Sequence, residues 1–408
     1  MSWREVQLGD GIHVKHGFAF KGEYFTAAGE YMVLTPGNFL EKGGFRVRDG
    51  KERFYHADFP EEYLLAEGDL IVAMTEQGEG LLGSAARIPA EGKYLHNQRL
   101  GLVQITDSEL LDKRFLYWIF NSAGVRAQIR ASATGAKVKH TAPERIKKVR
   151  LKVPELSDQQ AIAWVLDSYD DLIATNQRRI ALLEDAARRQ YREWFVHLRF
   201  PGYESVPVKD GVPAGWAKLP LGDVAEITMG QSPESKYYNT DGDGLPFHQG
   251  VSDFGHRFVK HETYTKQATR IAEAGDILCS VRAPVGRLNF TRDKIAIGRG
   301  LSAMRSRTGH QSLLFYQLDA LFVEEDMIGG GAIFASVGKK ELFGQLILQP
   351  STSIATTFNR LVSDLDLQIE NLDSQNQELA KARDLLLPKL ISGQLDVSGI
   401  ALPDEVAV

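Results

Sequence analysis

The chain has 408 residues, of which 43% are hydrophobic and 25% are charged, values typical of soluble globular proteins. Its one cysteine, Cys279, excludes an intrachain disulfide framework and fits a reducing compartment. No apolar run reaches the roughly 18 residues that span a bilayer, and the N-terminus lacks a signal-peptide profile, so we expect a cytoplasmic protein without a membrane partner. The net charge of −5 does not indicate a nucleic-acid binder, so any such function must rest on local basic surfaces.

The sequence repeats itself at a period of about 200 residues. Trp, Leu, Gly and Asp occur at equal spacing in residues 3–10 and in residues 216–223. Residues 67–71 and 274–278 share a Gly-Asp pair that is followed by two aliphatic side chains. A period of this length is too long for a solenoid repeat. It indicates a duplicated globular domain, with a helix after each copy.

Residues 1–153 are predicted to form a mixed α/β domain. Short apolar or alternating runs between glycines and prolines are typical of strands, and they occur at 31–34, 70–73 and 100–105. The amphipathic segment 112–129 predicts one helix. The first copy of the repeat therefore combines strands with a helix.

A long helix is predicted from residue 154 to residue 200. Residues 157–160 are of the types that cap a helix. The following apolar positions alternate by four and three, which is typical of a coiled-coil seam. The seam residues that we assign to pairing or partner docking are Leu166, Ile173, Asn176, Ile180, Leu183 and Trp194.

The second copy follows the same order. Residues 201–215 are rich in Pro and Gly and are interpreted as a linker, 216–349 as the second α/β domain, 350–393 as the second helix and 394–408 as a tail. Because a proline cannot continue a helical hydrogen-bond ladder, Pro388 is expected to kink or end the second helix. The docking residues of this helix are Val362, Ile369, Leu372, Asn376, Leu379 and Leu386.

Each seam contains an asparagine, Asn176 or Asn376. A buried asparagine lowers stability but fixes register and partner choice; alternatively, each is a polar break at a poorly buried position. The order domain, helix, domain, helix predicts that the two helices run antiparallel. The expected fold class is α+β, with two similar α/β domains separated by two long antiparallel coiled-coil helices and related by a pseudo-twofold axis.

Motifs of known chemistry are scarce. Gly78–Gly83 matches Gly-x-Gly-x-x-Gly, but dinucleotide binding needs a helix to begin there, and the run before Pro89 is too short for one. We therefore expect a glycine-rich loop near a ligand surface. Cys279 lies in a strand-like run and is interpreted as a buried apolar residue. The sequence predicts no metal site and no catalytic residue.

Two basic stretches lie in different copies of the repeat. Residues 126–152 hold nine Lys/Arg and one acid, and residues 282–307 hold seven Lys/Arg and one acid. Basic and amide side chains contact phosphates and read base edges. Polar loops at equivalent positions of the two copies carry different residues. This pattern indicates two domains that each recognise a different DNA sequence. The DNA-binding candidates are Lys21, Asn38, Thr75, Gln77, Arg99, Lys137, Lys139, Gln231, Ser232, Gln249, Arg282, Arg299 and Ser336.

Three segments resemble the DNA specificity subunits of type I restriction-modification systems. They are Gly-Gln-Ser-Pro at 230–233, the Gly-Asp segment 275–286, and Ala-Arg-Asp-Leu-Leu-Leu-Pro-Lys-Leu-Ile-Ser-Gly-Gln-Leu at 382–395, which is the most specific. The resemblance covers essentially the whole chain. It implies two target-recognition domains, each of which reads one half of a split DNA site, and two helical spacers that dock methyltransferase subunits.

The resemblance also implies the partners. They are double-stranded DNA, two methyltransferase (M) subunits, and restriction-translocase (R) subunits that join through the core of two M subunits and one specificity (S) subunit. S-adenosylmethionine and ATP with Mg²⁺ are expected on the partner subunits, with no cofactor and no catalysis on this chain. The alternatives are a specificity subunit of another restriction-methylation enzyme, of type IIB or IIG, a metal-dependent nuclease, and a coiled-coil scaffold that binds only protein.

Overall fold

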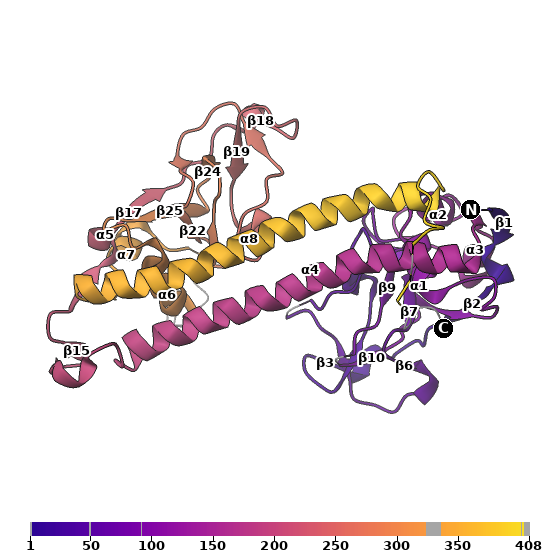
Figure 1. Ribbon diagram of the computed structural model, residues 1–408, viewed down its shortest axis with the longest axis horizontal. Coiled ribbons are helices and arrows are strands. Elements are labelled where there is room, and N and C mark those ends of the chain that lie inside the picture. Colours follow the sequence, from indigo (N-terminus) through magenta and orange to yellow (C-terminus); the bar gives the residue numbers. More distant parts are fainter. Residues whose placement is uncertain (1, 49, 91, 324–335, 401, 404–408) are drawn as a thin grey trace. The chain divides into compact units, whose positions relative to one another are not determined.

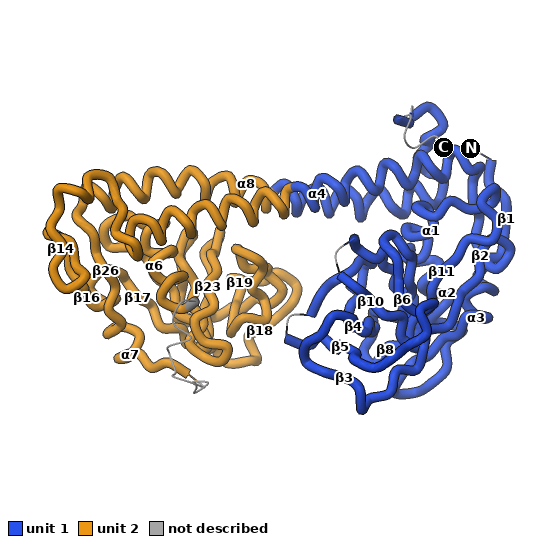
Figure 2. The backbone as a smooth tube through the Cα atoms, turned by 90° about the horizontal axis from the view of Figure 1, so that it is seen from below, with its two compact units in different colours: residues 1–175, 375–408 blue, residues 176–374 orange. Residues whose placement is uncertain are grey.

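The computed structural model describes residues 2–48, 50–90, 92–323, 336–400 and 402–403. They form two compact units, one of residues 1–175 with 375–408 and the other of residues 176–374 (Figure 2). Each unit contains one globular lobe together with part of each long helix. We call residues 2–153 lobe one and residues 216–349 lobe two.

Lobe one combines a four-stranded sheet, a five-stranded sheet and two-stranded pairs within its described residues (Figure 1). The four-stranded sheet has the order β2 (Ile12–His16), β11 (Leu100–Ile105), β7 (Leu70–Ala73) and β9 (Ala85–Arg87). The five-stranded sheet has the order β3 (Phe25–Thr26), β5 (Phe54–Tyr55), β4 (Tyr31–Val33), β10 (Lys93–Leu95) and β6 (Leu64–Leu65). The pairs are β1 (Arg4–Gln7) with β13 (Arg150–Val153) and β8 (Thr75–Glu76) with β12 (Lys139–His140). The strands expected in this lobe are therefore present.

Lobe two repeats this topology strand by strand. Its four-stranded sheet has the order β17 (Ala225–Met229), β25 (Leu301–Ser306), β22 (Ile277–Ser280) and β23 (Leu288–Phe290). Its five-stranded sheet has the order β18 (Tyr238–Asn239), β20 (Tyr264–Thr265), β19 (Leu245–His248), β24 (Ile295–Ile297) and β21 (Ile271–Ala272). β16 (Ala217–Pro220) pairs with β26 (Leu346–Gln349) as β1 pairs with β13. The matching orders confirm the internal duplication.

The short helices differ in one place from the sequence prediction. Lobe one contains α1 (Lys113–Phe120), α2 (Ala123–Ala131) and α3 (Pro143–Lys147), and lobe two contains α5 (Leu221–Val224), α6 (Gln311–Val323) and α7 (Lys339–Phe343). The single helix expected over 112–129 is wrong. Asp112 caps α1 by accepting a hydrogen bond from the Phe115 amide, and Ser122 caps a separate α2.

The segment between the helix and lobe two is more ordered than a plain linker. It contains the 3-10 turn η6 (Tyr203–Ser205) and a hairpin of β14 (Val208–Lys209) and β15 (Val212–Pro213). Val206 and Val212 of this segment pack against the hydrophobic core of lobe two. The interpretation of 201–215 as a linker therefore misses a small element that packs on lobe two.

The long helices are α4 (Leu156–Tyr191), which continues into the π turn η5 (Arg192–Val196), and α8 (Thr352–Ile391). Residues 157–160 lie inside the first turns of α4, so their interpretation as residues ahead of the helix is wrong. None of the described helices is both long and apolar enough to cross a bilayer.

Pro388 does not end the second helix, which was one of the two outcomes expected of it. Pro388 lies inside α8, which ends three residues later at Ile391. Proline has no N–H to donate to the Asp384 carbonyl, but the Pro388 carbonyl still accepts from the Ser392 amide at 3.1 Å. Leu390 is buried in the core of lobe one, which holds this last turn in place.

Both long helices are part of each lobe's hydrophobic core. In the first unit, Ile162 and Leu166 of α4 and Leu390 of α8 are fully buried in the lobe-one core. In the second unit, Phe358 of α8 lies 5.7 Å from Trp194, measured between ring centroids. Early residues of one helix meet late residues of the other in both units, so the helices are antiparallel. The predicted α+β class with two similar domains and two long antiparallel helices is confirmed.

A buried carboxylate fixes α4 on lobe one. Asp167 accepts hydrogen bonds from Arg87 at 3.0 Å, Arg114 at 2.8 Å and the Trp118 indole at 2.8 Å. Three charge-assisted donors from β9 and α1 therefore converge on one helical side chain, and each such bond is stronger than a neutral one.

Asp167→Ala is expected to lower the free energy of unfolding of the first unit by about 3 kcal/mol, because it leaves two guanidinium groups unpaired beside the core. Asp171→Ala removes an exposed carboxylate from the same helix and serves as the matched control. Denaturant titration of both variants measures the difference. Equal losses would contradict the assigned role of Asp167.

Candidate nucleic-acid interface

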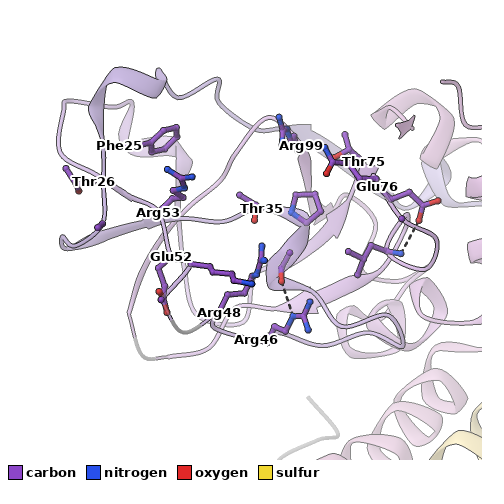
Figure 3. A pocket seen from close by; sticks show the side chains of 18 residues that line it. Phe25, Thr26, Thr35, Arg46, Arg48, Glu52, Arg53, Thr75, Glu76 and Arg99 are labelled. Atoms are coloured by element: carbon purple, nitrogen blue, oxygen red, sulfur yellow. Dashed lines mark hydrogen bonds between the residues drawn. The ribbon is translucent and has the colours of Figure 1, made fainter. Parts of the chain in front are cut away.

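A cleft of about 800 Å³ opens in lobe one at the ends of several strands. Its lining is basic, since the acids Glu52 and Glu76 face a larger set of cations, Arg46, Arg48, Lys51, Arg53 and Arg99. Figure 3 shows Arg99 beside Thr75 and the other arginines on the loop that precedes β5. A concave basic surface of this kind favours an anionic polymer.

The structure brings several lobe-one candidates together. Thr75, Gln77 and Arg99 all line the cleft. Lys139 lies opposite Glu76 in the β8–β12 pair, and Lys137 belongs to the turn that leads into β12. Lys21 is exposed at the start of the 3-10 turn η2 (Gly22–Tyr24) and is not among the lining residues. Three of these candidates therefore share one surface.

Asn38 belongs to the framework of lobe one, contrary to its assignment as a DNA contact. It is buried at the end of the 3-10 turn η3 (Pro36–Asn38). Its Oδ1 accepts from the Thr35 amide at 2.9 Å and from the Thr35 hydroxyl at 3.1 Å, and its Nδ2 donates to the Arg46 carbonyl at 3.2 Å. These bonds hold the cleft loop and occupy both ends of the amide.

The glycine-rich loop is held from inside the lobe. The buried Glu76 accepts from the amides of Gly80, Leu81 and Leu82 at 2.8–3.1 Å. A phosphate bound at this loop would need these same three amides as hydrogen-bond donors. The loop also leads into strand β9 and not into a helix. Gly78 and Leu81 line the basic cleft, so the loop does lie at the candidate surface.

The arginine-rich loop at 46–53 also lines the cleft and is not among the candidates predicted from the sequence. Arg46 donates from Nε to the Gly37 carbonyl at 3.0 Å. Arg48 lies close to Gly37, since a Cβ at Gly37 would come within 2.3 Å of the Arg48 guanidinium. Four basic residues within eight positions were a visible signal, but the two acids among them hid it from a count of net charge.

The lobe-two candidates form two groups. Gln231, Ser232, Gln249 and Arg299 surround the turn after β24. The Ser232 hydroxyl accepts from the Arg299 amide at 3.2 Å, and a Cβ on Gly298 would lie 3.0 Å from both Ser232 and Gln249. The structure thus places these four residues at one edge.

The second group pairs Arg282 with Ser336 across an isolated β-bridge. Beside it the Val337 amide donates to the Val281 carbonyl at 2.9 Å. In lobe one the Thr141 amide donates to the Met74 carbonyl at the same distance. Arg282 and Ser336 therefore occupy the same framework position as the β8–β12 pair, and both are exposed.

Much of the charge in the two basic stretches is used inside the lobes. Arg126 donates to backbone carbonyls, including one at 3.0 Å, and Arg130 pairs with Glu76 at 3.4 Å. In lobe two Arg292 pairs with carboxylates of α8, and Arg305 pairs with a carboxylate 2.7 Å away. The inference that both stretches as a whole face phosphates is therefore too broad.

The docking candidates on the helices point inward. Leu166, Asn176, Ile180, Trp194, Val362 and Ile369 are buried, and Ile173, Leu183, Leu372, Asn376, Leu379 and Leu386 are half-buried. A separate set of leucines on the two helices is exposed, namely Leu172, Leu182, Leu361, Leu367 and Leu385. The heptad periodicity of the sequence identifies the seam between the two long helices. It gives no signal for exposed apolar residues outside that seam.

Side chains of the types that bind metal ions or act as nucleophiles have structural surroundings in the described part of the chain. Among the described residues, no group of three or more His, Cys, Asp or Glu side chains is placed to hold a metal ion. Burial raises the pKa of the Cys279 thiol to about 12, so this thiol stays protonated near neutral pH.

Residues 1–185 match the type I restriction modification DNA specificity domain. A Methanocaldococcus jannaschii protein assigned as the MjaX type I restriction enzyme specificity subunit is 28% identical over 82% of this chain and 80% of its own length. The Escherichia coli type I restriction enzyme EcoBI specificity subunit is 21% identical over 97% of this chain and 86% of its own.

A solved structure supports the fold. The type I restriction-modification system S subunit from M. genitalium superposes with a TM-score of 0.57, at 16% identity and over 96% of both chains. Residues 1–185 thus match the family model of the type I restriction modification DNA specificity domain, and most of the chain is similar to specificity subunits of type I restriction enzymes.

Proposed function

We infer that this chain is the DNA specificity subunit of a type I restriction-modification complex, with each lobe reading one half of a bipartite DNA target. The observation that carries this conclusion is that both lobes present polar side chains at the same edge of the fold, which we call the reading edge. Two lobes of one topology present polar and basic side chains at equivalent strand ends, at Thr75 and Arg99 in lobe one and at Arg282 and Arg299 in lobe two. Different side chains on one framework suit two different half-sites.

We propose that the chain itself is not catalytic. Methyl transfer and cleavage then belong to two M subunits and to R subunits that join through them, with S-adenosylmethionine, ATP and Mg²⁺ bound there. Double-stranded DNA is the ligand of this chain, and the complex acts in the cytoplasm. Modification-sensitive sequencing of host DNA with and without the gene tests the proposal, because loss of the gene removes methylation at one bipartite sequence.

The helix surface is the proposed docking site for the M subunits. Leu182 is 69% exposed and lines a hollow of about 460 Å³ with Leu183 of α4 and Leu372 of α8. Arg179 and Asn371 edge the same hollow. An apolar floor with a polar rim is the usual anatomy of a protein interface.

Arg99→Ala is expected to weaken binding to the target duplex by about 1–3 kcal/mol and to relax the preference at one half-site. Arg282→Ala is expected to do the same at the other half-site. Arg4→Ala removes an exposed cation of lobe one outside the cleft and controls for net charge. Binding titrations with duplexes altered in one half measure both effects. If Arg99→Ala and Arg4→Ala lost affinity equally for all duplexes, the reading role of Arg99 would be wrong.

Leu182→Glu is expected to weaken M-subunit association at least about tenfold, because it places a charge on the apolar floor of the hollow. Val208→Glu alters an exposed apolar residue of the β14–β15 hairpin and serves as the control. Analytical ultracentrifugation of the purified subunits measures the association. Association that survives Leu182→Glu unchanged would place the docking surface elsewhere.

A further inference from the structure

The two lobes fasten the base of the same loop in chemically different ways. In each lobe the loop begins with a 3-10 turn, η3 in lobe one and η8 (Val251–Asp253) in lobe two. The carbonyl of the last residue of the turn accepts a backbone hydrogen bond from the returning part of the loop, at 2.9 Å from the Arg46 amide to Asn38 and at 2.8 Å from the Lys260 amide to Asp253. Asn38 and Asp253 therefore hold equivalent positions.

In lobe one the fastening side chains are neutral, since Asn38 bonds to Thr35 and to a backbone carbonyl. In lobe two they are titratable and form a chain, which we call the histidine relay. Asp253 Oδ2 lies 3.2 Å from His248 Nδ1, and His248 Nε2 lies 2.9 Å from His261 Nδ1. His261 Nε2 lies 3.0 Å from Asp293 Oδ2.

Each contact of the relay needs one proton. The two carboxylates accept, so His248 Nδ1 and His261 Nε2 must both carry hydrogen, and one further proton must lie between the two rings. Three protons on four ring nitrogens give the histidine pair one net positive charge. His248 is fully buried, and its burial lowers its pKa, while His261 is half-buried.

The relay lies directly under the reading edge of lobe two. The His248 carbonyl accepts from the Gly298 amide at 2.8 Å, which fixes the turn that carries Arg299. Gln249 follows His248 in the chain and is exposed. The Gln249 carbonyl would lie 2.2 Å from a Cβ on Gly300, so this strand end and this turn are in close contact. A shift of His248 would therefore move both Gln249 and Arg299, the two candidate DNA contacts at this edge.

We infer that His248 and His261 are positioning residues for DNA reading by lobe two, and that they make its contribution to affinity depend on one proton that lobe one does not need. The inference rests on the proposed function and adds a residue role and a pH dependence to it. Lobe one has the Thr35–Asn38 pair at the equivalent place and is the internal control.

The charged groups around the relay come from three segments. Asp253 belongs to η8, Lys260 and Glu262 flank His261, and Lys294 follows Asp293 and pairs with Glu273 at 3.1 Å. When pH rises through the range in which histidines titrate, the pair loses its extra proton and one relay bond is broken. The contribution is thus present at low pH and lost as pH rises. Loss of one such bond corresponds to about a fivefold loss of affinity.

The test uses the complex of the chain with its M subunits and a duplex that carries the target identified by host methylation. Affinity is measured from pH 6 to pH 8.5, with two further duplexes in which one or the other half-site is scrambled. The wild-type complex is expected to lose about fivefold in the contribution of one half-site alone. His261→Gln is expected to retain affinity and flatten this profile, because its amide can donate to His248 Nε2 without a charge.

His256→Gln is the matched control, since His256 is an exposed histidine of the same loop outside the relay. A flat wild-type profile, or one that His261→Gln leaves unchanged, would overturn the inference. Long-range ¹H–¹⁵N spectra of the free chain test the relay without DNA: at pH 6, His248 Nδ1 and His261 Nε2 must each carry hydrogen, and one further hydrogen must lie between the two rings. Any other pattern overturns the inference even where DNA binds. A complex that shows no preference for the target duplex would instead refute the proposed function.

Discussion

Carboxylates on the two long helices form ion pairs with guanidinium groups of each lobe. These ion pairs fix how each lobe is seated on its helical segments, and the placement of the other surfaces depends on them. Asp167 of α4 joins Arg87 and Arg114 of lobe one. Asp366 of α8 joins Arg257 of lobe two, whose guanidinium is almost fully buried. Apolar burial supplies most of the stabilisation but has no direction. A buried charge without its partner costs several kcal/mol, so the ion pairs select one seating of each lobe.

On this fixed framework, the loops carry the differences. Backbone bonds such as Thr141 to Met74 and Val337 to Val281 recur in both lobes at equal length. The side chains beside them differ, and so does the use of charge. Beyond the arginines that each lobe commits to the helices, Arg87 and Arg114 in lobe one and Arg257 and Arg292 in lobe two, several more line an open cleft in lobe one. Common main-chain geometry with divergent loops lets one fold carry two specificities.

Sequence reasoning found the repeat, the long helices and their seams, because these depend on periodic patterns. It missed what depends on local hydrogen bonds. Ser122 divides one amphipathic segment into two helices by capping the second, and Pro388 stays helical because tertiary packing holds the last turn. At the site, Thr75 and Arg99 were found by residue type, whereas Asn38 was misassigned because nothing in its type reveals that the fold uses its amide internally.

The division of each long helix between the two units has a consequence for how such proteins diversify. Asp167 lies in the part of α4 that belongs with lobe one, and Asp366 lies in the part of α8 that belongs with lobe two. Recombination that replaced only a lobe would leave these carboxylates without their arginine partners. If the lobes read DNA as proposed, exchange of one preference for another would therefore need to transfer a lobe together with its own helical segments, such as 1–175 with 375–408.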